Sequence, residues 1–306
     1  MRLAISAARR VADSSPGVSS HVTAVLATTR AIRSRTTAVG DLQSISRHPP
    51  IDYSHRVPQQ SVPRSSAWAP TLRRSVRLFR AFRLEQTQPD VFYGALADDA
   101  VGHVSQYADL AGSRMLDVGG GPGYFRRAFE DAGATYFALD ADAGELSGLG
   151  DIAQRTVLGS GMQLPFGDGT FDVCYSSNVL EHVSDPWRMA DEMVRVTRPG
   201  GITFVSYTVW FGPWGGHETA PWHYLGGRRA RRRYLRRHGH EPKNKFGESL
   251  FPVTVRAGLE WARAQSGSEV LDVVPRYNPR AARWLTSVPV MREVVTWNLV
   301  IVLRRR

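Results

Sequence analysis

The sequence predicts an α/β protein with a doubly wound, mainly parallel sheet of seven strands. From Arg114 onward, short apolar runs alternate with amphipathic segments of about ten to fifteen residues, the pattern of strand–helix–strand units. A glycine-rich stretch, MLDVGGGPGYF (115–125), coincides with the end of the first run. The chain has 306 residues, of which 42% are hydrophobic and 22% charged, so it can bury a full core.

The strands are predicted from seven apolar runs bounded by glycine, proline or polar residues. They are RMLDVG (114–119), TYFALD (135–140), RTVLG (155–159), FDVCYSSN (171–178), ITFVSYTVW (202–210), EVLDVVPRY (269–277) and TWNLVIVL (296–303), the last two at the sheet edge. Helices are predicted at 71–86, 90–108, 124–133, 186–197 and 253–264. In such sheets, ligands bind beyond the carboxyl ends of the strands, near the point where the strand order reverses.

Residues 1–66 differ in composition from the rest of the chain. They are rich in Ser, Thr, Arg and Ala and show no sustained apolar period. Such a segment buries too little apolar surface to offset the entropy of ordering, so we expect a disordered basic tail. A targeting segment and a start codon assigned too early are the alternatives. We expect one domain over residues 67–306, with N-terminal helices at 67–110 and a lid insert at 210–250 on the substrate side.

The positive charge is concentrated in two segments. The net charge is +11, and residues 1–66 contain nine Arg against three Asp. The segment Arg228–Arg237 contains seven Arg and no acid, so the two segments account for more than the whole excess. This arginine cluster suits an anionic membrane, an anionic acceptor or nucleic acid, and a solvated basic helix is the alternative.

The predicted helix at 71–86 is amphipathic and basic. Leu72, Val76, Phe79 and Phe82 share one helical stripe, and arginines lie off it. Such a helix either covers the core with its stripe or lies on an anionic membrane. Both interpretations remain open from the sequence.

Cysteine content and hydropathy exclude several classes of protein. Cys174 is the only cysteine, which excludes an internal disulfide framework and a cysteine-based zinc site, and no metal site is expected. No apolar run reaches the roughly 18 residues that a membrane span needs. We therefore expect a cytoplasmic protein. If it associates with a membrane, we expect peripheral contact with an anionic surface. The oligomeric state is left open.

The glycine-rich stretch does not fit two common nucleotide motifs. A dinucleotide fingerprint needs a small third residue where the chain has Tyr124 or, in the other frame, Arg126. A P-loop needs a Lys followed by Ser or Thr, which the loop lacks. The pattern that fits is D-x-G-x-G-x-G at 117–123. Its acid favours a ligand with a cationic end and repels a pyrophosphate, and its glycines allow close approach to the backbone.

With this motif the chain resembles the class I S-adenosylmethionine-dependent methyltransferases, whose first motif is an acid followed by G-x-G-x-G. Further pieces follow in that family's order: Asp140 at the end of the second strand, GMQLPFGDGTFDVCYSSNVLEHV (161–183) and RPGG (198–201). The resemblance runs from about residue 70 to the C-terminus and is closest to uncharacterised mycobacterial-type methyltransferases that share the SYTVW…GGHE and HYLGG pieces. It implies a Rossmann-like methyltransferase fold with S-adenosyl-L-methionine as cofactor. The implied cofactor-binding residues are Asp117, Gly119, Gly121, Gly123, Asp140, Ser160, Gly161, Met162 and Asn178.

The resemblance also implies roles for these residues. Asp117 would favour the cationic amino-acid end of the cofactor, directly or through water, and Asp140 would accept hydrogen bonds from the ribose hydroxyls. Ser160 stands where family members usually carry an Asp that takes the adenine amino group. A neutral hydroxyl accepts that hydrogen bond less strongly than a carboxylate. The backbone N–H groups of Gly161 and Met162 are expected to serve the adenine ring.

No catalytic residue is assigned from the sequence. Methyl transfer from a sulfonium needs alignment and a water-poor pocket, and it needs a base only if the acceptor loses a proton. For His182 a structural role beside the cofactor is the alternative to catalysis. The candidates are His182, His217, His223 and Tyr224. Asn178, Glu181 and Glu218 are further polar residues of the same two segments.

The aromatic residues of the insert indicate the class of acceptor. Substrate pockets are mostly apolar, so this segment favours an apolar or planar acceptor, which is a small-molecule or lipid-like one, and a lid that packs on the core is the alternative. The alternative is an RNA or protein methyltransferase that uses the arginine cluster, but nothing in the chain resembles an RNA-binding module, and nucleic acid is not expected as a partner. A cofactor-binding scaffold without activity is a third interpretation, and the complete glycine motif argues against it. The aromatic residues are Trp210, Trp214, Trp222, Tyr224 and Tyr234.

Overall fold

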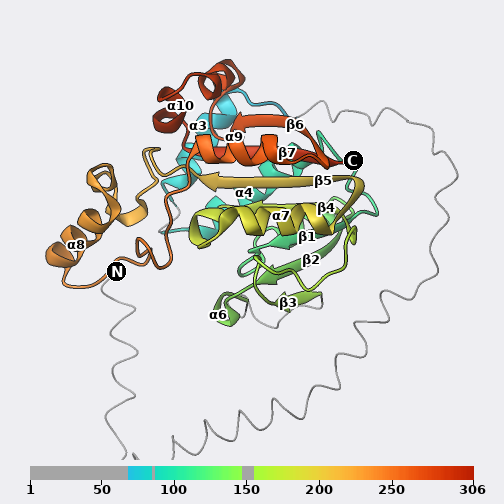
Figure 1. The fold of residues 1–306 in the computed structure, drawn as a ribbon, viewed down its shortest axis with the longest axis horizontal. Helices are drawn as coiled ribbons and strands as arrows, with labels where there is room; N and C mark the ends of the chain where they lie inside the picture. The colour runs from blue at the N-terminus through green and yellow to red at the C-terminus, as the bar shows by residue number, and fades with distance from the viewer. Residues whose placement is uncertain (1–67, 85–86, 147–154) are drawn as a thin grey trace, which may run out of the picture. The chain divides into compact units, whose positions relative to one another are not determined.

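The computed structural model describes residues 68–84, 87–146 and 155–306, so the tail predicted at 1–66 lies outside the described residues. A seven-stranded sheet forms the centre of the fold, with strand order β3-β2-β1-β4-β5-β7-β6 (Figure 1). The strands are β1 (Arg114–Val118), β2 (Thr135–Asp140), β3 (Thr156–Leu158), β4 (Phe171–Ser177), β5 (Thr197–Thr208), β6 (Ser268–Pro275) and β7 (Asn298–Arg305).

Strands β1 to β5 are mutually parallel, and β7 runs antiparallel to both of its neighbours, β5 and β6, so the edge strand β6 runs in the same direction as the first five. This confirms the predicted seven-stranded, mainly parallel sheet. The strand order reverses between β1 and β4. The crevice beyond the carboxyl ends of these two strands is therefore the expected ligand site. The RPGG stretch, which precedes the strand predicted at 202–210, lies within β5 near its start, where the pairing with β4 shifts register.

Helices cover both faces of the sheet because alternate strand residues point to opposite sides. On one face the strands pack against α7 and α9, and Leu116 belongs to this core. On the other face they pack against α3, α4 and α5, and the adjacent Met115 belongs there. These helices are α7 (Pro186–Val196), α9 (Val255–Ala264), α3 (Leu72–Phe82), α4 (Pro89–Val104) and α5 (Arg126–Asp131); the shorter α6 (Ala143–Leu146) follows β2.

The apolar stripe of α3, for which the sequence left core contact and membrane contact open, is largely exposed. Its outward members are Leu72 (66% exposed), Val76 (40%) and Phe79 (39%). The reason is a buried ion pair: Asp99 of α4 is fully enclosed, and Arg74 donates to both of its oxygens at 2.5 and 2.6 Å. A buried carboxylate without a partner is very costly, so Arg74 faces inward and turns the apolar stripe outward.

The insert at 210–250 contains short helical segments that follow the carboxyl end of β5. Three elements within it are η3 (His217–Thr219), η4 (Trp222–Leu225) and α8 (Gly227–His238). Between β4 and α7 lies η2 (Leu180–His182), and η5 (Arg280–Ser287) and α10 (Met291–Val295) precede β7. Within the described part of the chain, no helix combines the length and the apolar character needed to cross a membrane.

Candidate functional site

The glycine loop after β1 has the backbone that its spacing predicts. Gly119, Gly121 and Gly123 have φ values of +81°, +50° and +85°, a region that L side chains rarely adopt. A Cβ at Gly119 would lie 2.4 Å from Val179, whereas a Cβ at Gly121 or Gly123 would meet nothing within 4 Å. The loop is thus packed at Gly119 and open at Gly121 and Gly123, where a ligand has access to backbone.

Asp117 lies beneath this loop and not on its surface. Its side chain is buried, and the Tyr136 hydroxyl donates to its Oδ2 at 2.5 Å. Burial raises the pKa of Asp117 from 3.8 to about 7, the Tyr136 hydrogen bond opposes this shift, and the Asp140 charge adds to it. The interaction of Asp117 with a cationic ligand stays a prediction. Because its carboxyl is buried, we expect it to act through the loop or through water.

Asp140 ties the glycine loop to the end of β2. Its Oδ2 accepts from Gly121 N at 2.9 Å and its Oδ1 from Asp142 N at 2.9 Å. Each carboxylate oxygen has a second acceptor position. Asp140 is therefore fixed in orientation and retains acceptor capacity for two ligand hydroxyls, the role predicted for it.

The loop that follows β3 holds the residues predicted to bind adenine. Ser160 Oγ accepts from Met162 N at 3.2 Å. The Met162 amide, expected to serve the ring, therefore has an internal partner here, which limits that expectation. Gly161 is closely packed, because a Cβ there would lie 3.0 Å from Met189 and 3.1 Å from Val118.

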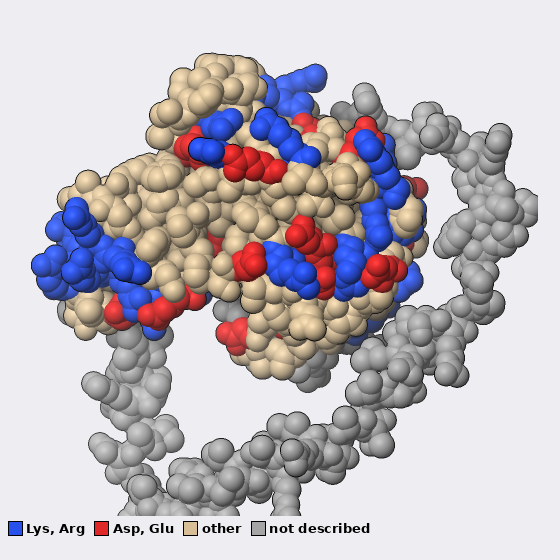
Figure 2. Space-filling view, viewed as in Figure 1, with Lys and Arg blue, Asp and Glu red and all other residues tan. Residues whose placement is uncertain are grey.

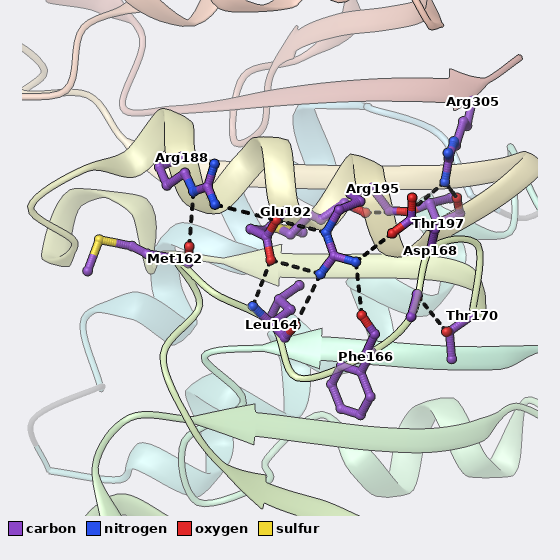
Figure 3. Close-up of polar contacts among 12 residues, drawn as sticks. Met162, Leu164, Phe166, Asp168, Thr170, Arg188, Glu192, Arg195, Thr197 and Arg305 are labelled. Carbon is purple, nitrogen blue, oxygen red and sulfur yellow. Dashed lines mark hydrogen bonds and ion pairs between the residues drawn. The ribbon is translucent and has the colours of Figure 1, made fainter. Parts of the chain in front are cut away.

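Polar contacts from α7 anchor this loop (Figure 3). Glu192 Oε2 accepts from Leu164 N at 2.9 Å, and Arg195 donates to the carbonyls of Leu164 (3.0 Å) and Phe166 (2.9 Å). Arg195 also pairs with both carboxylate oxygens of Glu192 at 2.8 Å, which lowers the pKa of Glu192. Sequence reasoning missed this pair, because its spacing also fits an ordinary exposed ion pair on a helix.

Asn178 adopts a left-handed backbone conformation (φ +57°) directly after β4. Its Oδ1 accepts from Asn298 Nδ2 at 2.7 Å, so β7 fixes its orientation. Arg276 lies beneath the same strand ends, 1% exposed, and donates to Ser177 Oγ at 2.6 Å and Ser206 Oγ at 2.8 Å. This buried guanidinium was not predictable, since Arg276 belongs to an apolar run predicted as a strand.

The structure brings two of the four catalytic candidates together. His182 of η2 and His217 of η3 have ring centroids 5.1 Å apart, and Glu181 lies beside them. His223 is buried within the insert against the Gly212 carbonyl (3.2 Å), and Tyr224 is 41% exposed beside the His223 ring. The Glu181–His182–His217 cluster includes neither His223 nor Tyr224.

Burial lowers the pKa of His217, one member of this cluster, from 6.5 to about 4, although the Glu181 charge opposes the shift. The His217 ring is thus neutral near pH 7. His217 also has a positive φ of +47°, a conformation that is uncommon for residues other than glycine and concentrates at functional sites.

A separate hollow of about 190 Å³ lies within the insert, between η3, η4 and α8. None of its lining residues belongs to the glycine loop or to the loop that follows β3. Trp222 and Arg233 line it, with the guanidinium 3.8 Å from the ring centroid. This hollow is not the site that the glycine motif defines.

Comparisons with known proteins agree with this architecture. A family model described as "Methyltransferase domain" matches residues 116–205. An uncharacterized methyltransferase of Mycobacteroides abscessus is 52% identical over 249 residues, covering 77% of this chain and 95% of that protein. One of Mycolicibacterium vanbaalenii is 54% identical over 244 residues, covering 76% and 95%.

A solved S-adenosylmethionine-dependent methyltransferase of Mesorhizobium loti is 22% identical, covering 68% of this chain and 98% of that one with a TM-score of 0.48. At this identity the likeness concerns the fold alone. The two mycobacterial relatives are matched over nearly their whole length at more than half identity. The chain therefore belongs to the same methyltransferase family as these mycobacterial proteins.

Proposed function

We propose that the protein transfers the methyl group of S-adenosyl-L-methionine to a small-molecule or lipid-like acceptor. The observation that carries this proposal is the glycine loop, with left-handed backbone at its three motif glycines and open space beside Gly121 and Gly123. Asp117, the acid that precedes the loop, disfavours a pyrophosphate and suits a cofactor with an ammonium and a sulfonium.

The described residues fit this cofactor. Asp140 would accept from the ribose hydroxyls with its remaining lone pairs, and the loop of Ser160–Met162 would contact the adenine. Asn178, held by Asn298, would lie between cofactor and acceptor at the end of β4. The bound cofactor supplies an already activated methyl group, so these residues need to bind, orient and exclude water.

An aromatic surface beside the insert supports an apolar acceptor. Trp214 of the insert lies 5.2 Å from Phe82 and 6.2 Å from Trp297 between ring centroids, and Phe79 lies 5.6 Å from Trp297. Trp214 is 40% exposed and Phe79 39%. Exposed aromatic groups that adjoin one another are typical of ligand or lipid contact.

Peripheral contact with an anionic membrane belongs to the same proposal. The outward stripe of α3 is apolar, and α3 also exposes arginines to pair with lipid headgroups. Figure 2 shows a second group of basic side chains gathered over α8. Its exposed members are Arg228, Arg229, Arg232, Arg236 and Arg237.

An RNA or protein acceptor is the second candidate, since the same α8 arginines would suit an anionic polymer. Two members of the cluster already have internal partners. Arg231 pairs with Glu241 and Glu248 at 2.7 Å each, and Arg233 lies over Trp222. The two carboxylates offset the charge of Arg231, whereas Arg233 stays charged over the Trp222 ring and five arginines of the cluster stay exposed.

Labelled methyl transfer tests the proposal. Extracts from a strain that lacks the gene are separated into small-molecule, lipid, RNA and protein fractions and incubated with the enzyme and methyl-labelled S-adenosyl-L-methionine. We expect label in the small-molecule or lipid fraction. Label confined to RNA or protein would establish the second candidate, and an absence of transfer to any fraction would contradict the activity.

A further inference from the structure

Glu181, His182 and His217 converge although 34 residues of chain separate the last two. The three side chains each offer a ligand atom, and these atoms lie within 4.8 Å of one another. The cluster adjoins the glycine loop, because Val179, two residues before Glu181, packs against Gly119. Within the described ranges this is the one group of three such side chains close enough to share an ion.

Two buried atoms of this cluster have no hydrogen-bond partner. Glu181 is 1% exposed, and its Oε1 accepts from Thr208 N at 3.0 Å, but its Oε2 has no partner among the described residues. His217 Nε2 is likewise buried and unpartnered in that part of the chain. Buried polar atoms normally have hydrogen-bond partners, and a bound ion is one of the recognised reasons for exceptions.

The third member is oriented as a metal ligand would be. His182 Nδ1 lies 2.8 Å from the Ser249 carbonyl, which can only accept, so Nδ1 carries the proton and Nε2 keeps a lone pair. Metal-binding histidines commonly donate their second ring nitrogen to a backbone carbonyl, which fixes the tautomer and the ring.

We propose that Glu181, His182 and His217 bind a divalent transition-metal ion such as Zn²⁺, Mn²⁺ or Fe²⁺. Two imidazoles and one carboxylate suit these ions, whereas Mg²⁺ prefers oxygen ligands alone. Ligand atoms in a tetrahedral site with bonds of about 2.1 Å lie about 3.4 Å apart, so small side-chain movements close the observed spacing.

Three protein ligands leave a coordination position open for water or substrate. An acceptor oxygen at that open position would be held beside the glycine loop and would lose its proton more readily. This role of the metal rests on the proposed function. The metal site itself does not depend on the acceptor, so failure of either proposal leaves the other testable.

Metal content and direct titration test the site. The full chain is purified without a histidine tag, stripped with chelator, and titrated with Co²⁺ at pH 7.5 while the visible absorption bands are recorded. We expect one ion per chain, displacement of Co²⁺ by Zn²⁺, and no competition from an excess of Mg²⁺. Glu181→Gln and His217→Gln should each weaken binding more than about tenfold.

A second histidine pair provides a matched control. His238 and His240 have ring centroids 6.1 Å apart, but both are exposed and they lie outside the Glu181 cluster. The double variant His238→Gln/His240→Gln should keep the wild-type Co²⁺ spectrum and stoichiometry. Wild-type protein without stoichiometric binding would overturn the proposal even if a variant fails to fold. Loss of binding in the control, with retention in Glu181→Gln, would also overturn it.

Discussion

Replacement of Asp117 by Asn tests the electrostatic design of the glycine loop. Asp117 is 2% exposed, and burial raises its pKa from 3.8 to about 7. A carboxyl with a raised pKa in the folded state binds its proton more tightly there than in the unfolded chain. Its contribution to stability is therefore complete below pH 3.8 and is lost as the pH rises through 7.

The size of this effect follows from the shift. One pKa unit corresponds to about 1.4 kcal/mol, so about three units correspond to a loss of about 4 kcal/mol between pH 4 and pH 8. Asn has nearly the same shape and does not titrate, so Asp117→Asn should lack this component. Subtracting the two curves cancels the other titrating groups, which the proteins share.

Urea unfolding followed by tryptophan fluorescence at half-unit steps from pH 4 to pH 8 gives both curves. The wild type should lose stability relative to Asp117→Asn by about 4 kcal/mol as the pH rises across this range. Parallel curves for the two proteins would show that Asp117 has the same pKa in the folded and the unfolded chain, which would contradict the pKa shift attributed to its burial.

Three further predictions concern the cofactor and the surface. Asp140→Ala should weaken S-adenosyl-L-methionine binding at least tenfold without unfolding the chain, because charge-assisted hydrogen bonds of about 1.5–3 kcal/mol each are lost; calorimetry giving unchanged affinity would place the ribose elsewhere. Arg195→Gln should weaken cofactor binding severalfold, because it releases the Leu164 and Phe166 carbonyls. The control Arg198→Gln, which removes a similar ion pair with Asp172, should leave binding unchanged, and equal effects of the two variants in equilibrium dialysis would contradict the anchoring role. Gln at the five exposed α8 arginines should reduce binding to phosphatidylserine vesicles at low salt, since each contributes about 1 kcal/mol near the surface; unchanged sedimentation with vesicles would remove the membrane contact.

Local features of the fold were predictable from the sequence. The alternation of apolar runs and helices predicts the strands, and the structure confirms the mainly parallel sheet. The spacing of Gly119, Gly121 and Gly123 predicts three positions that need unusual backbone, and all three have a positive φ. Both predictions depend on residues close together in sequence, where backbone sterics and side-chain period decide the outcome.

Tertiary contacts were not predictable in the same way. The orientation of α3 depends on Asp99, which lies 25 residues from its partner Arg74, and helix periodicity alone left open whether the apolar stripe covers the core. The contact between His182 and His217 depends on the position of the insert after β5 in the folded chain. The predicted roles of Ser160, Gly161, Met162 and Asn178 stay predictions, although the structure places their loops beside the carboxyl ends of β1, β3 and β4.

Calorimetric titration with S-adenosyl-L-methionine and, separately, with NAD⁺ tests the central claim most directly. The glycine loop with Asp117 beneath it and Asp140 beside it predicts one S-adenosyl-L-methionine per chain and no heat from NAD⁺. The Gly121→Val variant, which places a β-branched side chain at a φ of +50° in the open part of the loop, should abolish the signal. Binding of NAD⁺ without a response to S-adenosyl-L-methionine would contradict the account.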